Sequence, residues 1–170
     1  MTTINPYVAL ISFQEEFNKK RIIPKLINPN KNYYLEFDRP NGIPRFTYAF
    51  IIPSKVSPRF KSEVRAICQV APVEPYFDGK AVFQIGCAVL EKYQNQGLAK
   101  IFVADCLDIF ASEIILRNNI KEGIYFEAIV DKDNIPSQKL FEYLKFQKET
   151  ETDEGDFQYL KFVNGFQQPT

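Results

Sequence analysis

The chain has 170 residues and 21 basic against 21 acidic side chains, so its formal net charge is zero. Its hydrophobic content of 45% is ordinary for a globular protein, and no apolar run is long enough to span a bilayer. The sequence contains no His, which excludes Ser-His and Cys-His catalytic pairs and argues against a catalytic zinc site. We therefore expect a single domain over residues 1–170 that binds no metal.

The three cysteines, Cys68, Cys87 and Cys106, are isolated in the sequence. This spacing argues against disulfides and is typical of a reducing cytoplasm. The segment Met1–Phe13 contains Pro6 and no basic leader, so it does not resemble a signal peptide. No basic run is dense enough to indicate nucleic-acid binding. We expect a cytoplasmic protein that binds neither nucleic acid nor a membrane.

Charge is distributed unevenly along the chain. Up to Lys61 there are ten basic and four acidic residues, whereas the remainder has eleven basic and seventeen acidic residues. Two differently charged, solvated faces would explain this distribution. The alternative is a basic side that suits an anionic ligand and an acidic side that attracts a cation.

The first part of the chain predicts one helix and three strands. Tyr7–Phe13 is compatible with a strand or a helix start, and Ser12 with Glu15 forms a capping-box pattern. That helix should end before Pro24. Strands are expected at Tyr33–Phe37, Arg45–Ile52 and Val64–Val70. Turns or breaks are expected at Asn28–Asn32, Asp38–Gly42, Pro72, Pro75 and Asp78–Gly79.

The second part alternates strands and helices. Ala81–Leu90 is the longest predicted strand, and Leu98–Arg117 is predicted as a largely buried helix. A further strand, a short helix and a hairpin follow at Ile124–Val130, Pro136–Leu144, Phe146–Thr150 and Phe157–Val163. This order predicts an α/β protein with a mixed sheet.

The junction between the longest strand and the long helix contains Gly97. Glycine has no Cβ, so a ligand can approach its backbone closely. The first amides of a helix carry partial positive charge and suit an anionic phosphate group. An ordinary strand-turn-helix junction is the alternative. Neither a Gly-x-Gly-x-x-Gly nor a Walker pattern is present here.

The stretch Val89–Ala99 resembles motif A of the GNAT N-acetyltransferases, in which Gln/Arg-x-x-Gly-x-Gly/Ala holds the pyrophosphate of acetyl-CoA. The resemblance implies a role for Lys92 and Lys100 in adding positive charge. It also implies that pyrophosphate is bound by the amides of Gln94, Asn95, Gln96, Gly97, Leu98, Ala99 and Lys100. The strand end that pairs with the pantetheine arm in this family corresponds to Cys87, Ala88 and Val89.

A second stretch, Asp133–Phe146, resembles motif B of the same family, Asn-x-x-Ala/Ser-x-x-Leu-Tyr-x-x-x-Gly-Phe. The residues that match in register are Asn134, Ser137, Leu140 and Phe146. Asn134 is expected to hydrogen-bond the cofactor, and it can also cap the helix that follows. The two motifs lie within Ala81–Phe146, under half of the chain.

The resemblance implies the GNAT fold, with a central, mostly antiparallel sheet and helices on both faces. It implies transfer of an acetyl group from acetyl-CoA to a primary amine by direct attack in a ternary complex, with CoA as the product. The acceptor would be an amine-bearing small molecule or a peptide. Because many relatives dimerise, a homodimer is left open.

Several positions depart from the family pattern. Many members carry a Tyr in motif B that protonates the leaving thiolate, but the matching residue here is Phe141. Tyr143 is two residues further on and points to another face of the helix. Lys145 replaces the usual Gly, so the turn before Phe146 is expected to differ slightly. A branch of the family uses a Glu as base where this chain has Ile129.

Glu127 is the leading candidate for the base. It lies two residues before Ile129, and residues two apart on a strand share a face. Glu74 and Gln84 are further candidates. The N–H of Val89 or Leu90 could hold a developing oxyanion. Without the usual acid and base, a non-catalytic GNAT-fold module that binds acyl-CoA or a protein is the alternative function.

Overall fold

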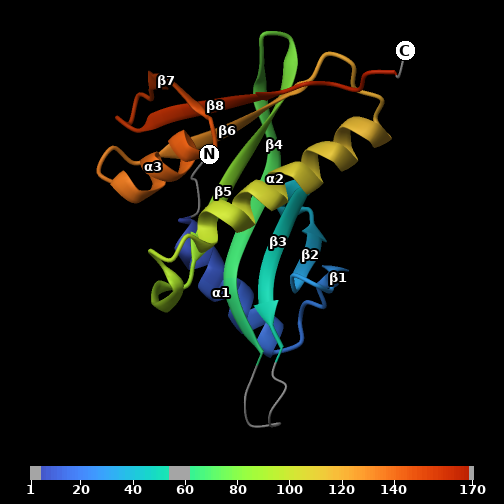
Figure 1. Ribbon diagram of the computed structural model, residues 1–170, viewed down its shortest axis with the longest axis vertical. Coiled ribbons are helices and arrows are strands. Elements are labelled where there is room, and N and C mark those ends of the chain that lie inside the picture. The colour runs from blue at the N-terminus through green and yellow to red at the C-terminus, as the bar shows by residue number, and fades with distance from the viewer. Residues whose placement is uncertain (1–4, 54–61, 169–170) are drawn as a thin grey trace. The chain divides into compact units, whose positions relative to one another are not determined.

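The computed structural model describes residues 5–53 and 62–168 (Figure 1). Three α-helices are described: α1 (Pro6–Asn18), α2 (Leu98–Arg117) and α3 (Ile135–Tyr143). Two short 3₁₀ turns are η1 (Pro40–Gly42) and η2 (Glu91–Tyr93). The described strands are β1 (Lys25–Asn28), β2 (Tyr33–Asp38), β3 (Arg45–Ile52), β4 (Glu63–Phe77), β5 (Lys80–Val89), β6 (Ile124–Val130), β7 (Gln147–Glu151) and β8 (Phe157–Val163).

The strands follow one another in the order β1-β2-β3-β4-β5-β6-β8-β7. Among the pairs whose register is described, β5 and β6 are parallel and the others are antiparallel. A parallel pair requires a crossover connection, which α2 supplies between these two strands. The predicted mixed, mostly antiparallel sheet is confirmed.

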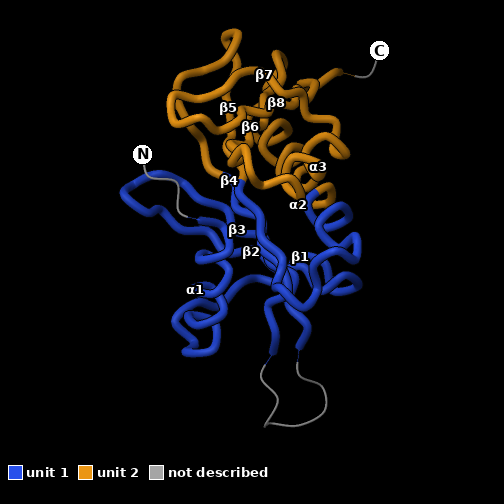
Figure 2. Tube along the Cα trace, turned by 90° about the vertical axis from the view of Figure 1, so that its left-hand side faces the viewer, with its two compact units in different colours: residues 1–70, 86–103 blue, residues 71–85, 104–170 orange. Residues whose placement is uncertain are grey.

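The chain divides into two compact units (Figure 2). Unit 1 comprises residues 1–70 and 86–103, and unit 2 comprises residues 71–85 and 104–170. Strands β4 and β5 and helix α2 contribute residues to both units. The expectation of a single domain over residues 1–170 stays a prediction.

Unit 1 has a helix on each face of its strands. Ala49 and Ile51 of β3 are buried with Leu10 and Phe13 of α1 in one core cluster. Phe50 lies between them in sequence and therefore points to the opposite face. There its ring and that of Tyr33 lie 6.4 and 5.2 Å from the ring of Phe102 in α2. The alternation of β3 thus explains why both faces are covered.

Unit 2 is built on β6, whose burial alternates from residue to residue. Ile124, Phe126, Ala128 and Val130 are buried. Phe126 packs against Phe110 of α2, with ring centroids 5.9 Å apart. The intervening residues, Tyr125, Glu127 and Ile129, form the other, half-buried face of the strand.

The structure corrects three expectations in the first half of the chain. Helix α1 begins at Pro6, where Asn5 caps it through the Tyr7 N–H, so Ser12 lies inside the helix and is not its cap. Strand β1 was not expected. Strand β4 continues through Pro72 and Pro75 to Phe77. The register of β3 with β4 ends at Val70, and beyond it a proline costs no hydrogen bond to β3.

The other predicted elements are confirmed within one or two residues, apart from the extended β4. Among the described residues, no helix combines the length and apolar character needed to cross a membrane. The same residues contain no group of three or more His, Cys, Asp or Glu side chains placed to hold a metal ion.

Replacing Phe126 by Ala tests the core of unit 2. The ring is 1% exposed, so the variant leaves a cavity, and we expect a loss of about 3–5 kcal/mol in the free energy of unfolding. Phe162→Ala is the matched control, because this ring is 44% exposed and should cost only about 1 kcal/mol. Urea unfolding followed by circular dichroism measures both. Equal losses would contradict the assigned faces of the sheet.

Candidate functional site

The backbone between β5 and α2 turns through two left-handed residues. After Val89 the chain forms the 3₁₀ turn η2, and Asn95 and Gly97 then adopt φ values of 60° and 77°. Gly and Asn tolerate this conformation better than other residues. A Cβ built at Gly97 meets nothing within 4 Å. The glycine is therefore required by its backbone conformation, and the space above it is open.

The amides that follow this turn are exposed at the start of α2. For the N–H groups of Gln96, Gly97, Leu98 and Ala99, the described part of the chain offers no hydrogen-bond acceptor. The first turn of α2 contains no acidic residue. Unpaired amides at a helix start and the helix dipole together favour an anion. Phosphate binding at this junction of unit 1 stays a prediction.

The two glutamine side chains that follow η2 stabilise the turn itself. Gln94 donates from Nε2 to the carbonyl of Val89 at 2.9 Å, and Gln96 donates to the carbonyl of Lys92 at 3.2 Å. Their side-chain amides are therefore engaged with the backbone. The backbone N–H groups are what this segment leaves for a ligand.

The end of β5 exposes one edge of its backbone. The Leu90 N–H donates to the carbonyl of Arg65 in β4 at 2.8 Å, which removes it as an oxyanion donor. Because alternate residues of a strand direct their N–H groups to the same edge, the N–H groups of Cys87 and Val89 point away from β4. The parallel register of β5 with β6 covers only Val82–Gln84. Of the two expected oxyanion donors, Val89 remains.

The Cys87 thiol is not an activated nucleophile. Burial raises its pKa, and the neighbouring Cys68 raises it further. The thiolate is the reactive form of cysteine, so a raised pKa keeps this side chain inert near neutral pH. Ala88, on the opposite face of β5, packs against the core cluster of α1. Cys87 and Ala88 thus contribute backbone groups and packing at the strand end.

A charged cluster fastens the turn to the start of β4. Lys92 forms a 2.6 Å ion pair with Glu63, and the Tyr93 hydroxyl donates to the same carboxylate. Arg65 lies 4.3 Å from the centre of the Tyr93 ring and 3.2 Å from the Glu63 carboxylate. Lys92 is therefore paired within the protein, and its charge is offset by Glu63.

The cluster is ionised near neutral pH. Partial burial acts to raise the pKa of Glu63, but hydrogen bonds from Lys92, Tyr93 and Arg65 and the charge of Lys92 bring the pKa below its ordinary value. The hydrogen bond to Glu63 raises the pKa of Lys92 in turn. Both shifts favour the charged pair.

Asn134 lies in unit 2 and caps α3. Its side-chain oxygen accepts the N–H of Ser137 at 3.2 Å, and Pro136 occupies the first turn of the helix. The capping role is confirmed, and the expected contact with the cofactor stays a prediction. The structure thus places the residues 87–100 in unit 1, and Asn134 and Glu127 in unit 2.

Phe141 occupies a core position. Its ring is 4% exposed and packs against Phe146 and Tyr159, with centroids 5.1 and 6.3 Å away. Tyr143 is 57% exposed, on another face of α3, as expected. Lys145 itself adopts φ 67°, and the N–H groups of Lys145 and Phe146 close the helix on the carbonyls of Glu142 and Phe141. No proton donor therefore replaces Tyr at position 141.

Glu127 is half-buried and hydrogen-bonded by two glutamines. Gln84 donates to it at 3.1 Å and Gln158 at 2.7 Å. Gln84 acts here as a donor, which argues against its own role as a base. Glu74, the remaining candidate for the base, is exposed on β4.

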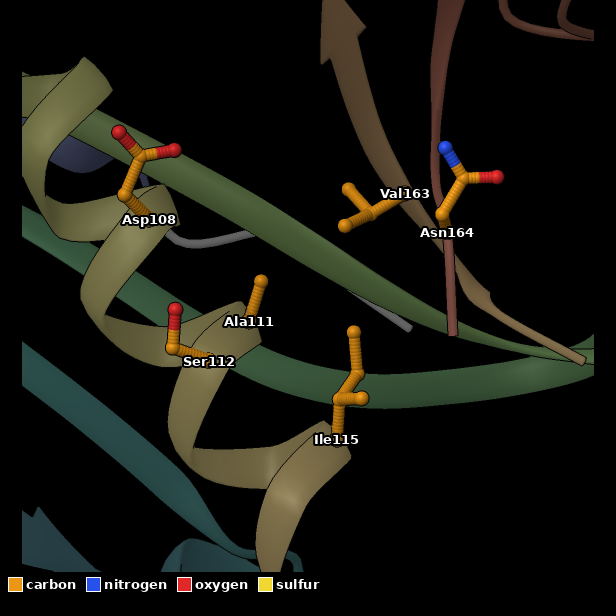
Figure 3. A pocket seen from close by; sticks show the side chains of 6 residues that line it. All are labelled: Asp108, Ala111, Ser112, Ile115, Val163 and Asn164. Atoms are coloured by element: carbon orange, nitrogen blue, oxygen red, sulfur yellow. The ribbon is translucent and has the colours of Figure 1, made fainter. Parts of the chain in front are cut away.

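A hollow of about 490 Å³ lies on unit 2 (Figure 3). It is lined by Asp108, Ala111, Ser112, Ile115, Val163 and Asn164. None of the residues predicted to bind the cofactor lines it. The predicted site therefore depends on exposed backbone of the β5–α2 turn and not on this hollow.

The comparisons with known proteins support the fold. No protein-family model matches the chain, and no curated protein matches its sequence. An acetyltransferase of the GNAT family from Streptococcus pneumoniae superposes with a TM-score of 0.50 at 11% identity, covering 72% of this chain and 67% of that protein. A domain from Methanocaldococcus jannaschii DSM 2661 gives 0.51 at 18% identity, covering 70% and 67%. A protein from Acinetobacter baylyi ADP1 gives 0.51 at 12%, covering 76% and 69%.

At these low identities the likeness concerns the fold alone. The chain has the fold of the GNAT acetyltransferases, as its mixed sheet and covering helices indicate. The predicted fold is confirmed. The roles of individual residues depend on the geometry described above.

Sequence reasoning missed the residues that support the candidate groups. Glu63 and Arg65 lie at the start of β4, and Gln158 lies on β8. Pairing of the start of β4 with the end of β5, and of β6 with β8, brings them to their partners. No local motif marks such residues, because the contacts are distant in sequence.

Glu63→Gln tests whether this cluster fastens the turn. The variant removes the charge that pairs with Lys92, so we expect faster hydrogen exchange at the Tyr93 and Gln94 amides without a large change in overall stability. Asp38→Asn, which breaks the ion pair with Arg45 elsewhere in unit 1, is the control and should leave these amides unchanged. Exchange measured by NMR gives the protection factors.

The pH dependence of the same protection has a defined sign. Because the folded pKa of Glu63 lies below its ordinary value of 4.5, its contribution is complete above that pH and is lost as the pH falls through the folded pKa. The protection factors of the wild type and of Glu63→Gln should therefore converge in acid. A difference that persists at about pH 2 would show that the ion pair is not its cause.

Proposed function

We propose that the protein is an N-acetyltransferase that binds acetyl-CoA at the β5–α2 turn and transfers the acetyl group to a primary amine. The amine attacks directly in a ternary complex, and CoA is released. The observation that carries this proposal is the run of unpaired amides from Gln96 to Ala99 beside the left-handed Gly97. The GNAT fold of the chain supports it.

The turn and the strand end are proposed to bind different parts of the cofactor. The amides of Gln96–Ala99 are the proposed ligands of the pyrophosphate, because the Gln94 N–H already donates to the Glu91 carbonyl at 3.1 Å. The outward edge of Cys87–Val89 is the proposed partner of the pantetheine arm. Asn134 is proposed to donate from its amide nitrogen, since its oxygen caps α3. The open space above Gly97 fits a bound phosphate group.

The proposed reaction does not depend strongly on a general acid. A thiol with a pKa of about 8.5 leaves as the thiolate without being protonated. The general acid that is missing because position 141 is Phe is therefore the most dispensable catalytic group. The Val89 N–H is the proposed oxyanion donor, because it points away from β4. Glu127 is the proposed group that receives the acceptor amine.

A non-catalytic acyl-CoA-binding module is the second candidate. One observation favours it: Phe141, which stands at the position of the usual Tyr, is packed into the core and has no proton to donate. The cofactor site is the same in both proposals, and only turnover separates them.

We propose a cytoplasmic location as well, supported by Cys68, Cys87 and Cys106, none of which forms a disulfide. The acceptor is proposed to be an amine-bearing small molecule or a peptide. A homodimer stays a prediction. Light scattering tests it by measuring the molar mass in solution.

Gly97→Glu tests the turn. A carboxylate placed beside the unpaired amides would compete with the pyrophosphate, and we expect at least about a tenfold loss of CoA affinity by calorimetry. Gly42→Glu is a matched control, because Gly42 has φ 79° and equally open surroundings. It introduces the same side chain and a similar backbone strain away from the turn. Equal affinities for CoA in the two variants would contradict the assignment.

Turnover is tested by the release of free thiol from acetyl-CoA. We expect release with at least one member of a panel of peptides, polyamines, amino acids and aminoglycosides. Tight CoA binding without release across the whole panel would favour the binding module. Absence of CoA binding to the wild type would contradict both candidates.

A further inference from the structure

A row of hydrogen-bonded side chains crosses four strands of unit 2. It runs from Gln84 on β5 to Glu127 on β6, Gln158 on β8 and Thr150 on β7. The three donor–acceptor distances are 3.1, 2.7 and 3.0 Å. The only ionisable member of this row is Glu127.

Thr150, the last residue of the row, fixes the orientation of the Gln158 side-chain amide. The Thr150 hydroxyl donates to Oε1 of Gln158, which directs the NH₂ group of Gln158 toward Glu127. Gln84 donates to the other side of the carboxylate, so Oε1 and Oε2 each accept one amide. Each carboxylate oxygen has a second lone pair, which these two bonds leave unused. Glu127 is therefore held in place with acceptor capacity remaining.

Glu127 is half-buried, and among the described residues it forms no ion pair. A partly buried charge without a counter-charge is costly to fold, and neutral amides do not cancel it. By contrast, Glu63 in unit 1 is neutralised by Lys92. A cationic ligand would supply the missing charge at Glu127.

An exposed aromatic cluster lies on the same face of β6. Tyr125 is two residues before Glu127, about 7 Å along the strand, and its side chain shares that face. Its ring lies 4.9 Å from Phe77 and 5.3 Å from Phe162, which are 41% and 44% exposed. Lys80, which is paired with Asp78, already places its ammonium 5.9 Å from the Phe162 ring. Exposed rings beside a carboxylate suit an organic cation with an apolar body.

We infer that Glu127 and this aromatic cluster form a binding site for an organic primary ammonium with an apolar or aromatic body. The ammonium donates to the free lone pairs of Glu127, while the apolar body covers Tyr125 and its neighbours. Gln84, Gln158 and Thr150 are positioning residues for the carboxylate. Binding of the cation stands on this geometry alone, whereas its identity as the acetyl acceptor rests on the proposed function.

The probe is phenethylammonium, titrated into the ¹⁵N-labelled protein and followed by NMR. We expect shifts at the Glu127 amide and at the side-chain NH₂ signals of Gln84 and Gln158. The neutral comparison is 2-phenylethanol, which keeps the ring and lacks the charge. We expect it to bind at least about tenfold more weakly, because a charge-assisted hydrogen bond is lost.

Three variants locate the interaction. Glu127→Gln keeps the shape of the side chain and should weaken phenethylammonium binding about tenfold or more. Glu149→Gln removes a charge from an exposed position of β7 and should leave the affinity unchanged. Thr150→Val keeps the side-chain shape and frees Gln158 to turn, so it should weaken binding about two- to fivefold.

The outcomes are distinct. Equal affinity of Glu127→Gln and the wild type, equal binding of the alcohol and the ammonium, or no binding to the wild type would each overturn the inference. A thermal melt of each variant shows whether it folds, and if Glu127→Gln fails to fold, Thr150→Val carries the test. CoA is titrated into the same samples. CoA binding without ammonium binding contradicts this inference alone, and the reverse contradicts the proposed function alone.

Discussion

The left-handed turn that joins β5 to α2 is the constraint on which the candidate cofactor site depends. With Asn95 and Gly97 at positive φ, the chain turns into α2, and the amides of Gln96–Ala99 find no acceptor in the part of the chain that the structure describes. Gln94 and Gln96 support the turn from within, and the cluster around Glu63 fastens it to β4. An anion-binding site made of backbone requires such support, because its donors cannot be adjusted by side-chain rotation.

The two candidate regions handle charge in opposite ways. In unit 1, Lys92 and Arg65 share the Glu63 carboxylate, so this cluster keeps one net positive charge beside the backbone amides and the helix dipole. In unit 2, two neutral glutamines fix the position of the Glu127 carboxylate, which has no ion pair among the described residues. A net charge of zero thus conceals one region suited to an anion and another suited to a cation.

The fold was largely predictable from sequence because its strongest signals are local. The apolar stretches of β3 and β6 and the polar stripe at helical spacing in α2 predicted these elements with their observed bounds. Asn5 was missed as a cap because Ser12 and Glu15 form a better pattern, and Pro72 and Pro75 wrongly predicted the end of β4. The carboxylate clusters could not be predicted from the sequence, because Glu63 contacts Lys92, and Gln158 contacts Glu127, only after the sheet has formed. Strand register, and not any motif, brings them together.

Chemical-shift mapping of CoA binding on the ¹⁵N-labelled protein tests the central claim most directly, because it observes the backbone amides themselves. The account predicts downfield proton shifts at the amides of Gln96, Gly97, Leu98 and Ala99 as they gain a phosphate acceptor. The amide shifts of Cys87 and Val89 on the edge of β5 should saturate at the same CoA concentration as those of the turn. CoA binding that leaves the amides from Gln96 to Ala99 unshifted would contradict the assignment of this turn as the pyrophosphate site.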